Sequence, residues 1–155
     1  MSYKSILVNL DVEGPIVPVV KAASELAQRW NARLTGFCAT DAYLPVTGPE
    51  GAELAAEVWR QMRDDDERRF KDLRKEFEAL VAGVVATDWR VAQERPTYAL
   101  AQAARIADIV VTGAADGAAT KDTARRVDPG SAVLQLGRPL LVVGNDMAHR
   151  VGRKI

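Results

Sequence analysis

The sequence has very few of the residues that metal sites and catalytic triads most often use. Among its 155 residues there is one cysteine, Cys38, and one histidine, His149. A single cysteine excludes an internal disulfide, and one cysteine with one histidine is too few for a zinc cluster. A Ser-His-Asp triad would have to use His149, for which the sequence suggests no partner. We therefore expect neither a metal site nor a catalytic triad.

An excess of one charge and long apolar runs are also absent. The chain has 21 basic and 21 acidic residues, so its formal net charge is zero, and no basic stripe or aromatic platform appears. These features argue against nucleic-acid binding. No apolar stretch approaches the ~20 residues that cross a bilayer, and the first apolar run ends at Asp11 without a signal-peptide pattern. We expect a cytoplasmic protein that binds neither nucleic acid nor membrane.

Five short segments read as β-strands. Runs such as ILV, IVV and LLVV are apolar on consecutive residues, which is typical of parallel strands covered by helices on both faces. The third segment is more polar and alternates. The predicted strands span residues 5–10, 34–39, 87–93, 108–113 and 139–144.

The segments between these strands carry apolar residues at helical spacing. The predicted helices span residues 16–30, about 50–81, 96–107 and 130–136, and Gly14-Pro15 is expected to start the first. Asp128 and Pro129 form a capping residue and a first-turn proline for the last helix, which Gly137 ends. Strands that alternate with helices predict an α/β fold: an open five-stranded parallel sheet, Rossmann-like, with helices on both faces. Residues 1–144 are the expected domain and 145–155 a C-terminal tail.

Open parallel sheets bind ligands outside the carboxyl ends of their strands, where the winding reverses. Asn9, Asp11, residues 38–41 (which include Cys38) and Gly113 all fall at that edge, together with the loop 114–129. The loop is rich in small residues, which let backbone N–H groups approach an anion, and a helix start follows it. Its composition predicts a phosphate cradle, to which Lys121, Arg125 and Arg126 add positive charge.

Each of these residues also has a purely structural interpretation. Consecutive helical residues point in different directions, so Asp64 to Asp66 read as a solvated helix face rather than a metal site. The other structural interpretations are a turn for Asp11, a tight strand exit for Gly113, a small core residue for Cys38, solvated side chains for Arg125 and Arg126, and a capped first helical turn for Gly130-Ser131.

The sequence resembles the universal stress protein family over nearly its whole length. The resemblance rests on YKSILVNLD at residues 3–11, ADIVVTG at 107–113 and GSAVLQLGRPLLVV at 130–143. It implies an adenine nucleotide alpha hydrolase-like fold. Many members bind ATP at the switch point of the sheet and act as dimeric stress-response or signalling proteins rather than vigorous enzymes.

The family's nucleotide signature is a glycine, two residues, a glycine, nine residues, and then Gly-Ser or Gly-Thr. Gly113 matches the first glycine, but the second falls on Asp116, with Gly117 one place later. The final pair falls on Arg126-Val127, and Gly130-Ser131 comes four residues too late. Repulsion between Asp116 and a nearby phosphate would weaken phosphate binding by ~1 kcal/mol or more at short range. Inward-pointing Arg125 and Arg126 would compensate for it.

The resemblance implies a homodimer, paired through the last strand from Pro139 to Gly144, with an altered pocket for ATP or another adenine nucleotide such as AMP. It places Asp11 near the adenosine and Cys38 near the adenine edge. The alternatives are an interaction scaffold that has lost nucleotide binding and a slow ATP hydrolase, for which only Asp11 and Asp116 are candidates. The residues expected to contact nucleotide are Asn9, Asp11, Cys38, Gly113, Asp116, Gly117, Arg126, Gly130 and Ser131.

Overall fold

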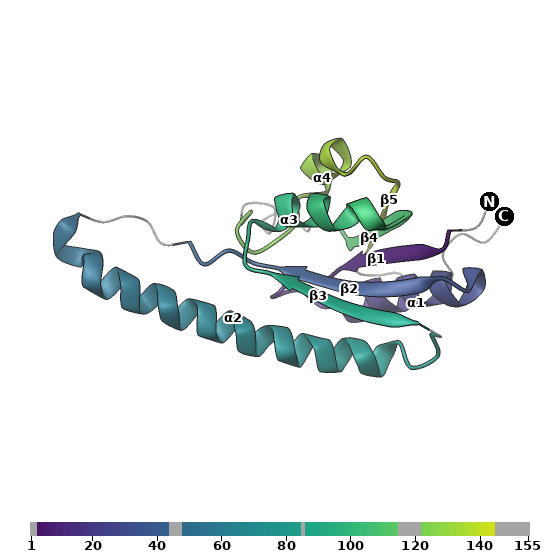
Figure 1. The fold of residues 1–155 in the computed structure, drawn as a ribbon, viewed down its shortest axis with the longest axis horizontal. Helices are drawn as coiled ribbons and strands as arrows, with labels where there is room; N and C mark the ends of the chain where they lie inside the picture. Colours follow the sequence, from purple (N-terminus) through teal and green to yellow (C-terminus); the bar gives the residue numbers. More distant parts are fainter. Residues whose placement is uncertain (1–2, 44–47, 85, 115–121, 145–155) are drawn as a thin grey trace.

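The computed structural model describes residues 3–43, 48–84, 86–114 and 122–144. Its strands form one parallel five-stranded sheet in the order β3-β2-β1-β4-β5 (Figure 1), which confirms the predicted fold class. The strands are β1 (Ser5–Asn9), β2 (Arg33–Ala39), β3 (Thr87–Ala92), β4 (Ile109–Gly113) and β5 (Leu140–Val143).

The sheet winds in two directions from its centre. β1 pairs with β2 on one side and with β4 on the other, and Ile6 lies opposite both Leu34 and Ile109. The chain therefore reverses its winding between β1 and β4. In open sheets of this kind, the crevice at the carboxyl ends of such a strand pair is where ligands bind.

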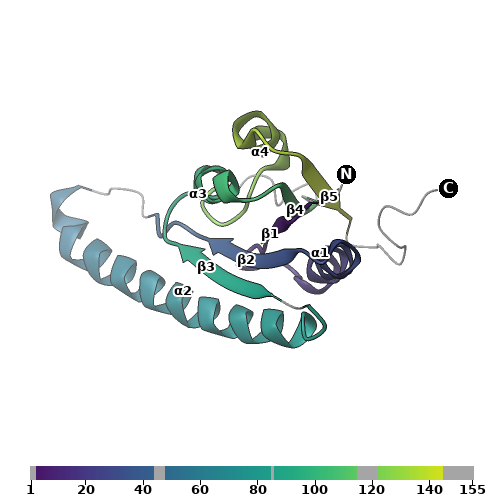
Figure 2. The same ribbon diagram turned by 45° about the vertical axis from the view of Figure 1, so that its right-hand side comes forward.

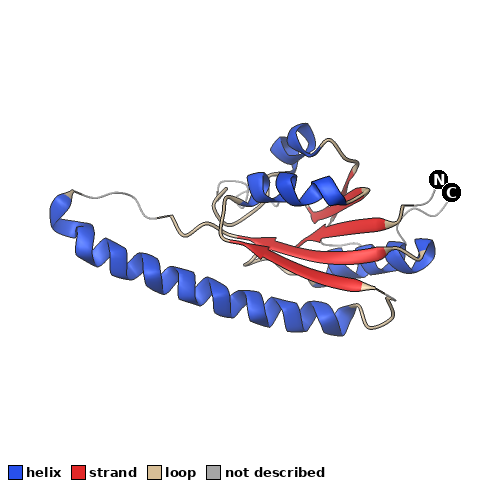
Figure 3. Cartoon of the chain, in the orientation of Figure 1, coloured by secondary structure: helices blue, strands red, loops and turns tan. Residues whose placement is uncertain are grey.

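In the part of the chain that the structure describes, four α-helices cover the two faces of the sheet: α1 (Val17–Trp30), α2 (Ala52–Leu80), α3 (Pro96–Ala103) and α4 (Pro129–Leu136). Figure 3 shows α1 and α2 on one face and α3 and α4 on the other. Two cores result, because strand side chains alternate between the faces. Ile6 and Val8 lie in the core under α1 and α2, and Leu7 lies in the core under α3 and α4.

Helix boundaries differ from the prediction by a few residues, most clearly at the first and third helices. The first helix begins at Val17, not at Ile16, and its first-turn proline is Pro18. Gly14 instead belongs to a turn, in which its N–H donates to the Asp11 carbonyl at 3.2 Å. The predicted helix 96–107 ends as a 3-10 turn, Ala104–Ile106, after α3.

The long helix α2 is buried along only part of its length. Its buried residues, Asp66, Phe70, Leu73 and Phe77, all lie in its second half. From Ala52 to Asp65 no side chain is buried, and Figure 2 shows this half of the helix extending beyond the sheet. Within the described residues, no helix is both long enough and apolar enough to cross a membrane.

Candidate functional site

A polar cluster joins the carboxyl ends of β1 and β4 at the point where the winding reverses. Asn9 is the last residue of β1 and is almost fully buried. Its amide Nδ2 donates to Thr112 Oγ1 at 3.1 Å and to Asp11 Oδ1 at 3.3 Å. The buried amide therefore ties β4 to the residues that follow β1, and it fixes the Asp11 carboxylate at the crevice.

The Asp11 carboxylate is already hydrogen-bonded by the chain. Besides the Asn9 amide, its Oδ1 accepts the Val127 N–H at 3.3 Å. Burial raises the pKa of Asp11, while the hydrogen bonds from Val127 and Asn9 and the charge of Arg126 act to lower it. The segment before α4 thus folds over the end of β1.

Asp128 occupies the amino terminus of α4. Its Oδ2 accepts the Ser131 N–H at 3.2 Å and the Ser131 hydroxyl at 2.6 Å. These bonds, chiefly those from the Ser131 side chain, hold the pKa of Asp128 below its usual range. Helix amino termini attract anions, and here the anion is a carboxylate of the chain itself. Gly130 and Ser131 accordingly form the first turn of a capped helix.

Arg125 crosses the crevice between β1, β2 and α2. Its Nη2 donates to Asp66 Oδ1 at 3.2 Å, its Nη1 donates to Thr40 Oγ1 at 3.4 Å, and its Nε pairs with Glu13. The side chain is only 22% exposed. The interpretation of Arg125 as a solvated side chain is therefore wrong, because the guanidinium has partners on α2, on the segment after β1 and on the segment after β2. Arg126 is half-buried.

Asp66 does not lie on a solvated face, contrary to the prediction for Asp64 to Asp66. It is 4% exposed, whereas Asp64 and Asp65 are exposed. A signal for this was present in the sequence, since Asp66 stands four residues before Phe70 and seven before Leu73, on the apolar stripe of the helix. Burial raises the pKa of Asp66, although Arg125 acts to lower it.

The segment before α4 is also attached to the end of β2. The Asp41 N–H donates to the Ala124 carbonyl at 2.8 Å, and the Thr40 hydroxyl donates to the same oxygen at 3.4 Å. The sequence placed Thr40 at this edge of the sheet but did not predict its partner, which lies 84 residues away. The segment 122–128 is therefore held by both β1 and β2.

The remaining predicted residues lie in different surroundings. Gly113 is half-buried, and a Cβ there would meet nothing within 4 Å. Gly137 is the one glycine in the described ranges with a positive φ, 60°, so the backbone does not require glycine at 113. Cys38 is buried in the core under α1 and α2, where burial raises the pKa of its thiol. Asp116, Gly117 and Lys121 lie outside the described residues.

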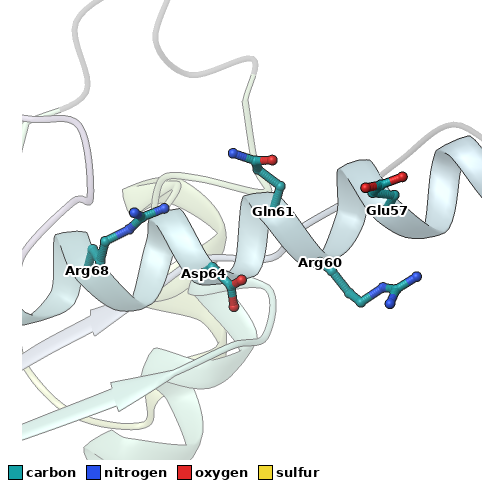
Figure 4. Close-up of a pocket in the computed structure, with 5 residues that line it drawn as sticks. All are labelled: Glu57, Arg60, Gln61, Asp64 and Arg68. Carbon is teal, nitrogen blue, oxygen red and sulfur yellow. The ribbon is translucent and has the colours of Figure 1, made fainter.

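One hollow of about 310 Å³ lies along the outer face of α2, lined by Glu57, Arg60, Gln61, Asp64 and Arg68. Figure 4 shows that all five side chains come from this helix and project in different directions. Among the described residues, only α2 lines the hollow, which makes it a charged helix surface rather than an enclosed binding site. The described ranges contain no group of three or more His, Cys, Asp or Glu side chains placed to hold a metal ion.

No family model matches the chain, and no curated protein matches its sequence. Many solved structures do match its fold. One is the universal stress protein UspA from Lactobacillus plantarum, which is 20% identical with a TM-score of 0.73, over 92% of this chain and 99% of that one.

Two further matches are described as nucleotide complexes. The universal stress protein from Archaeoglobus fulgidus in complex with dAMP is 16% identical, with a TM-score of 0.59 over 92% of this chain and 99% of that one. A universal stress family protein from Arabidopsis thaliana with AMP bound is 12% identical, with a TM-score of 0.59 over 93% of each chain. At such identities the likeness establishes the fold, and this chain has the universal stress protein fold.

Proposed function

We propose that this chain is a universal-stress-type regulatory module whose crevice binds the adenosine part of an adenine nucleotide and disfavours a long phosphate chain. The observation that carries the proposal is the Asp128 carboxylate, which caps the amino terminus of α4 through Ser131. A triphosphate placed against that terminus would meet a negative charge where a helix start otherwise attracts anions.

The adenosine end of the crevice keeps polar groups suited to a sugar. Asp11 and Asn9 lie at the switch point, and hydroxyl groups of a ribose are natural donors to a carboxylate. Structures of the same fold are described in complex with dAMP and with AMP, both monophosphates. These observations together support a preference for AMP over ATP.

We also propose that the module is a homodimer paired through β5. This strand lies at the edge of the sheet, and Val142 on it is 45% exposed. An uncovered apolar edge invites aggregation, and pairing with a second copy would cover it. Light scattering at micromolar concentration should give the mass of a dimer, and the mass of a monomer would contradict the proposal.

Calorimetry with adenosine, AMP, ADP and ATP, each with and without Mg²⁺, tests the nucleotide proposal. We expect AMP to bind more tightly than ATP and no release of phosphate over hours. Tighter binding of ATP than of AMP would contradict the proposed role of Asp128. Steady release of phosphate from ATP would instead identify a slow hydrolase.

An interaction scaffold that binds no nucleotide is the second candidate. The observation that favours it is that the polar groups of the crevice already have partners within the chain. Asp11 accepts a hydrogen bond from Val127, and Arg125 donates one to Asp66. The absence of heat with every nucleotide, from a protein that melts cooperatively, would select the scaffold over the nucleotide-binding module.

A further inference from the structure

Residues 122–126, which we call the strap, lie across the crevice. The chain leaves β4 at Gly113, yet the Ala124 carbonyl accepts the N–H of Asp41, which follows β2, at 2.8 Å. In the sheet, β1 separates β2 from β4. The connection from β4 to α4 therefore extends over the carboxyl ends of β1 and β2, the place where an open parallel sheet binds ligands.

The strap occupies polar groups that a ligand in this crevice would otherwise meet. It accepts the Asp41 N–H, and Arg125 Nη1 donates to Thr40 Oγ1 at 3.4 Å. Next to the strap, the Val127 N–H donates at 3.3 Å to Asp11 Oδ1, on the carboxylate proposed to accept a ribose hydroxyl. A nucleotide at the ends of β1 and β2 would compete with the chain for these groups.

Polar contacts hold the strap, whereas an apolar side chain anchors the residue that follows it. No side chain of residues 122–126 is buried, but Val127 is 4% exposed and belongs to the core under α3 and α4. Apolar burial therefore fixes Val127 and contributes little to the strap itself. The strap can leave the crevice without exposing this core, because water can replace its hydrogen bonds and ion pairs.

One side chain of the strap, that of Arg125, contacts three other parts of the chain. Besides Thr40 after β2, it donates to Asp66 Oδ1 on α2 at 3.2 Å and pairs with Glu13 after β1. Hydrogen bonds between ionised groups are stronger than neutral ones, so these contacts favour the closed position of the strap.

We propose that the strap is an autoinhibitory element, which Arg125 holds closed over the crevice and which must open before an adenine nucleotide binds. The inference rests on the proposed nucleotide function. A ligand that binds only the open state has its apparent affinity reduced by the fraction of molecules that are open. Weakening the contacts of Arg125 should therefore strengthen nucleotide binding, although it removes no group from the ligand's side of the crevice.

Amide hydrogen exchange, followed by NMR, tests the opening without any nucleotide. The Asp41 N–H is bonded to the strap, whereas the Leu10 N–H donates to the Phe37 carbonyl at 2.8 Å, between β1 and β2. Relative to their intrinsic rates, we expect the Asp41 amide to exchange about tenfold faster than the Leu10 amide, or more. Equal protection of the two amides would show that the strap opens only together with the sheet, and it would overturn the proposal.

Arg125→Gln/Asp66→Asn tests the role of Arg125 and leaves no unpaired charge at this ion pair. We expect this double variant to raise the Asp41 exchange rate about tenfold and the AMP affinity about threefold to tenfold, with Leu10 exchange unchanged. Arg74→Gln/Glu78→Gln is the matched control, because it removes an exposed ion pair on the same helix as Asp66, and it should change neither quantity.

The outcomes separate this proposal from the nucleotide proposal. Faster Asp41 exchange in the double variant with unchanged or weaker AMP binding would overturn the autoinhibition and leave nucleotide binding standing. The absence of AMP binding by both wild type and the double variant in calorimetry would overturn both.

A second variant covers the case in which the double variant fails to fold by circular dichroism. Thr40→Val/Glu13→Gln removes two partners of Arg125 and keeps its ion pair with Asp66. It should raise AMP affinity about twofold to threefold, since the side chain of Glu13 is half exposed. Unchanged Asp41 exchange in whichever variant folds would overturn the proposal.

Discussion

Replacing Asp128 should separate its role as a helix cap from its role as a charge. Asp128→Asn keeps an oxygen that can accept the Ser131 N–H, and asparagine caps helices about as well as aspartate. Asp128→Ala removes the acceptor. For a domain of this size, loss of one cap should lower Tm by about 3 °C. We therefore expect Asp128→Ala to melt about 3 °C below wild type and Asp128→Asn to melt close to it.

The charge itself should act on phosphate binding. An ionic group at a helix terminus changes the free energy by an amount equivalent to about a twofold to fivefold change in affinity at low salt. Both substitutions remove the carboxylate, so both should strengthen ATP binding by about that factor while leaving adenosine binding unchanged. Isothermal calorimetry at low ionic strength measures this, and the gain should shrink with added salt.

Asp122→Asn is the matched control, because Asp122 is an exposed acid in the same segment and does not cap α4. It should change neither Tm nor the ratio of ATP to adenosine affinity. If ATP affinity stays constant in both Asp128 variants while adenosine still binds, then Asp128 does not repel the phosphates. The proposed preference for AMP would then need another cause.

Three further predictions concern stability and assembly. Gly36→Ala should destabilise by about 1–3 kcal/mol in urea unfolding, because its Cβ would stand 2.7 Å from Trp89 Cε3, and unchanged stability would mean that the ring moves freely aside. Because burial raises the pKa of Asp66, the ionised carboxylate destabilises the folded state at high pH, and protonation removes this destabilisation as the pH falls. Asp66→Asn should therefore raise the urea midpoint at pH 7, with the gain vanishing toward pH 3, and a lower midpoint at pH 7 would refute this sign. If the proposed dimer forms through β5, Val142→Lys should give a monomer in light scattering without lowering Tm by more than a few degrees, and a dimer that persists in this variant would contradict pairing through β5.

The elements of the fold were predictable because their signals are local. Runs such as IVV before Gly113 predict buried parallel strands, and Asp128-Pro129 predicted both the cap and the first turn of α4. The start of α1 was misplaced, because a proline suits any position of a first helical turn and the chain offers both Pro15 and Pro18.

The crevice was less predictable, because its contacts join distant parts of the chain. Arg125 pairs with Glu13, 112 residues away, and with Asp66, 59 residues away. No local pattern specifies such pairs. Asp66 was a different case, since its spacing to Phe70 placed it on the buried stripe, but three successive acids were interpreted as one exposed group.

The uneven burial of α2 divides this helix into two parts with different local opening energies. A helical segment with no buried side chain depends on its own hydrogen bonds, and isolated helices of that length are marginally stable in water. Amides from Ala52 to Asp65 should exchange with deuterium far faster than those beyond Phe70. A partner that binds the first part would make it rigid without changing the packing of the sheet. Asp66 lies at the boundary between the two parts.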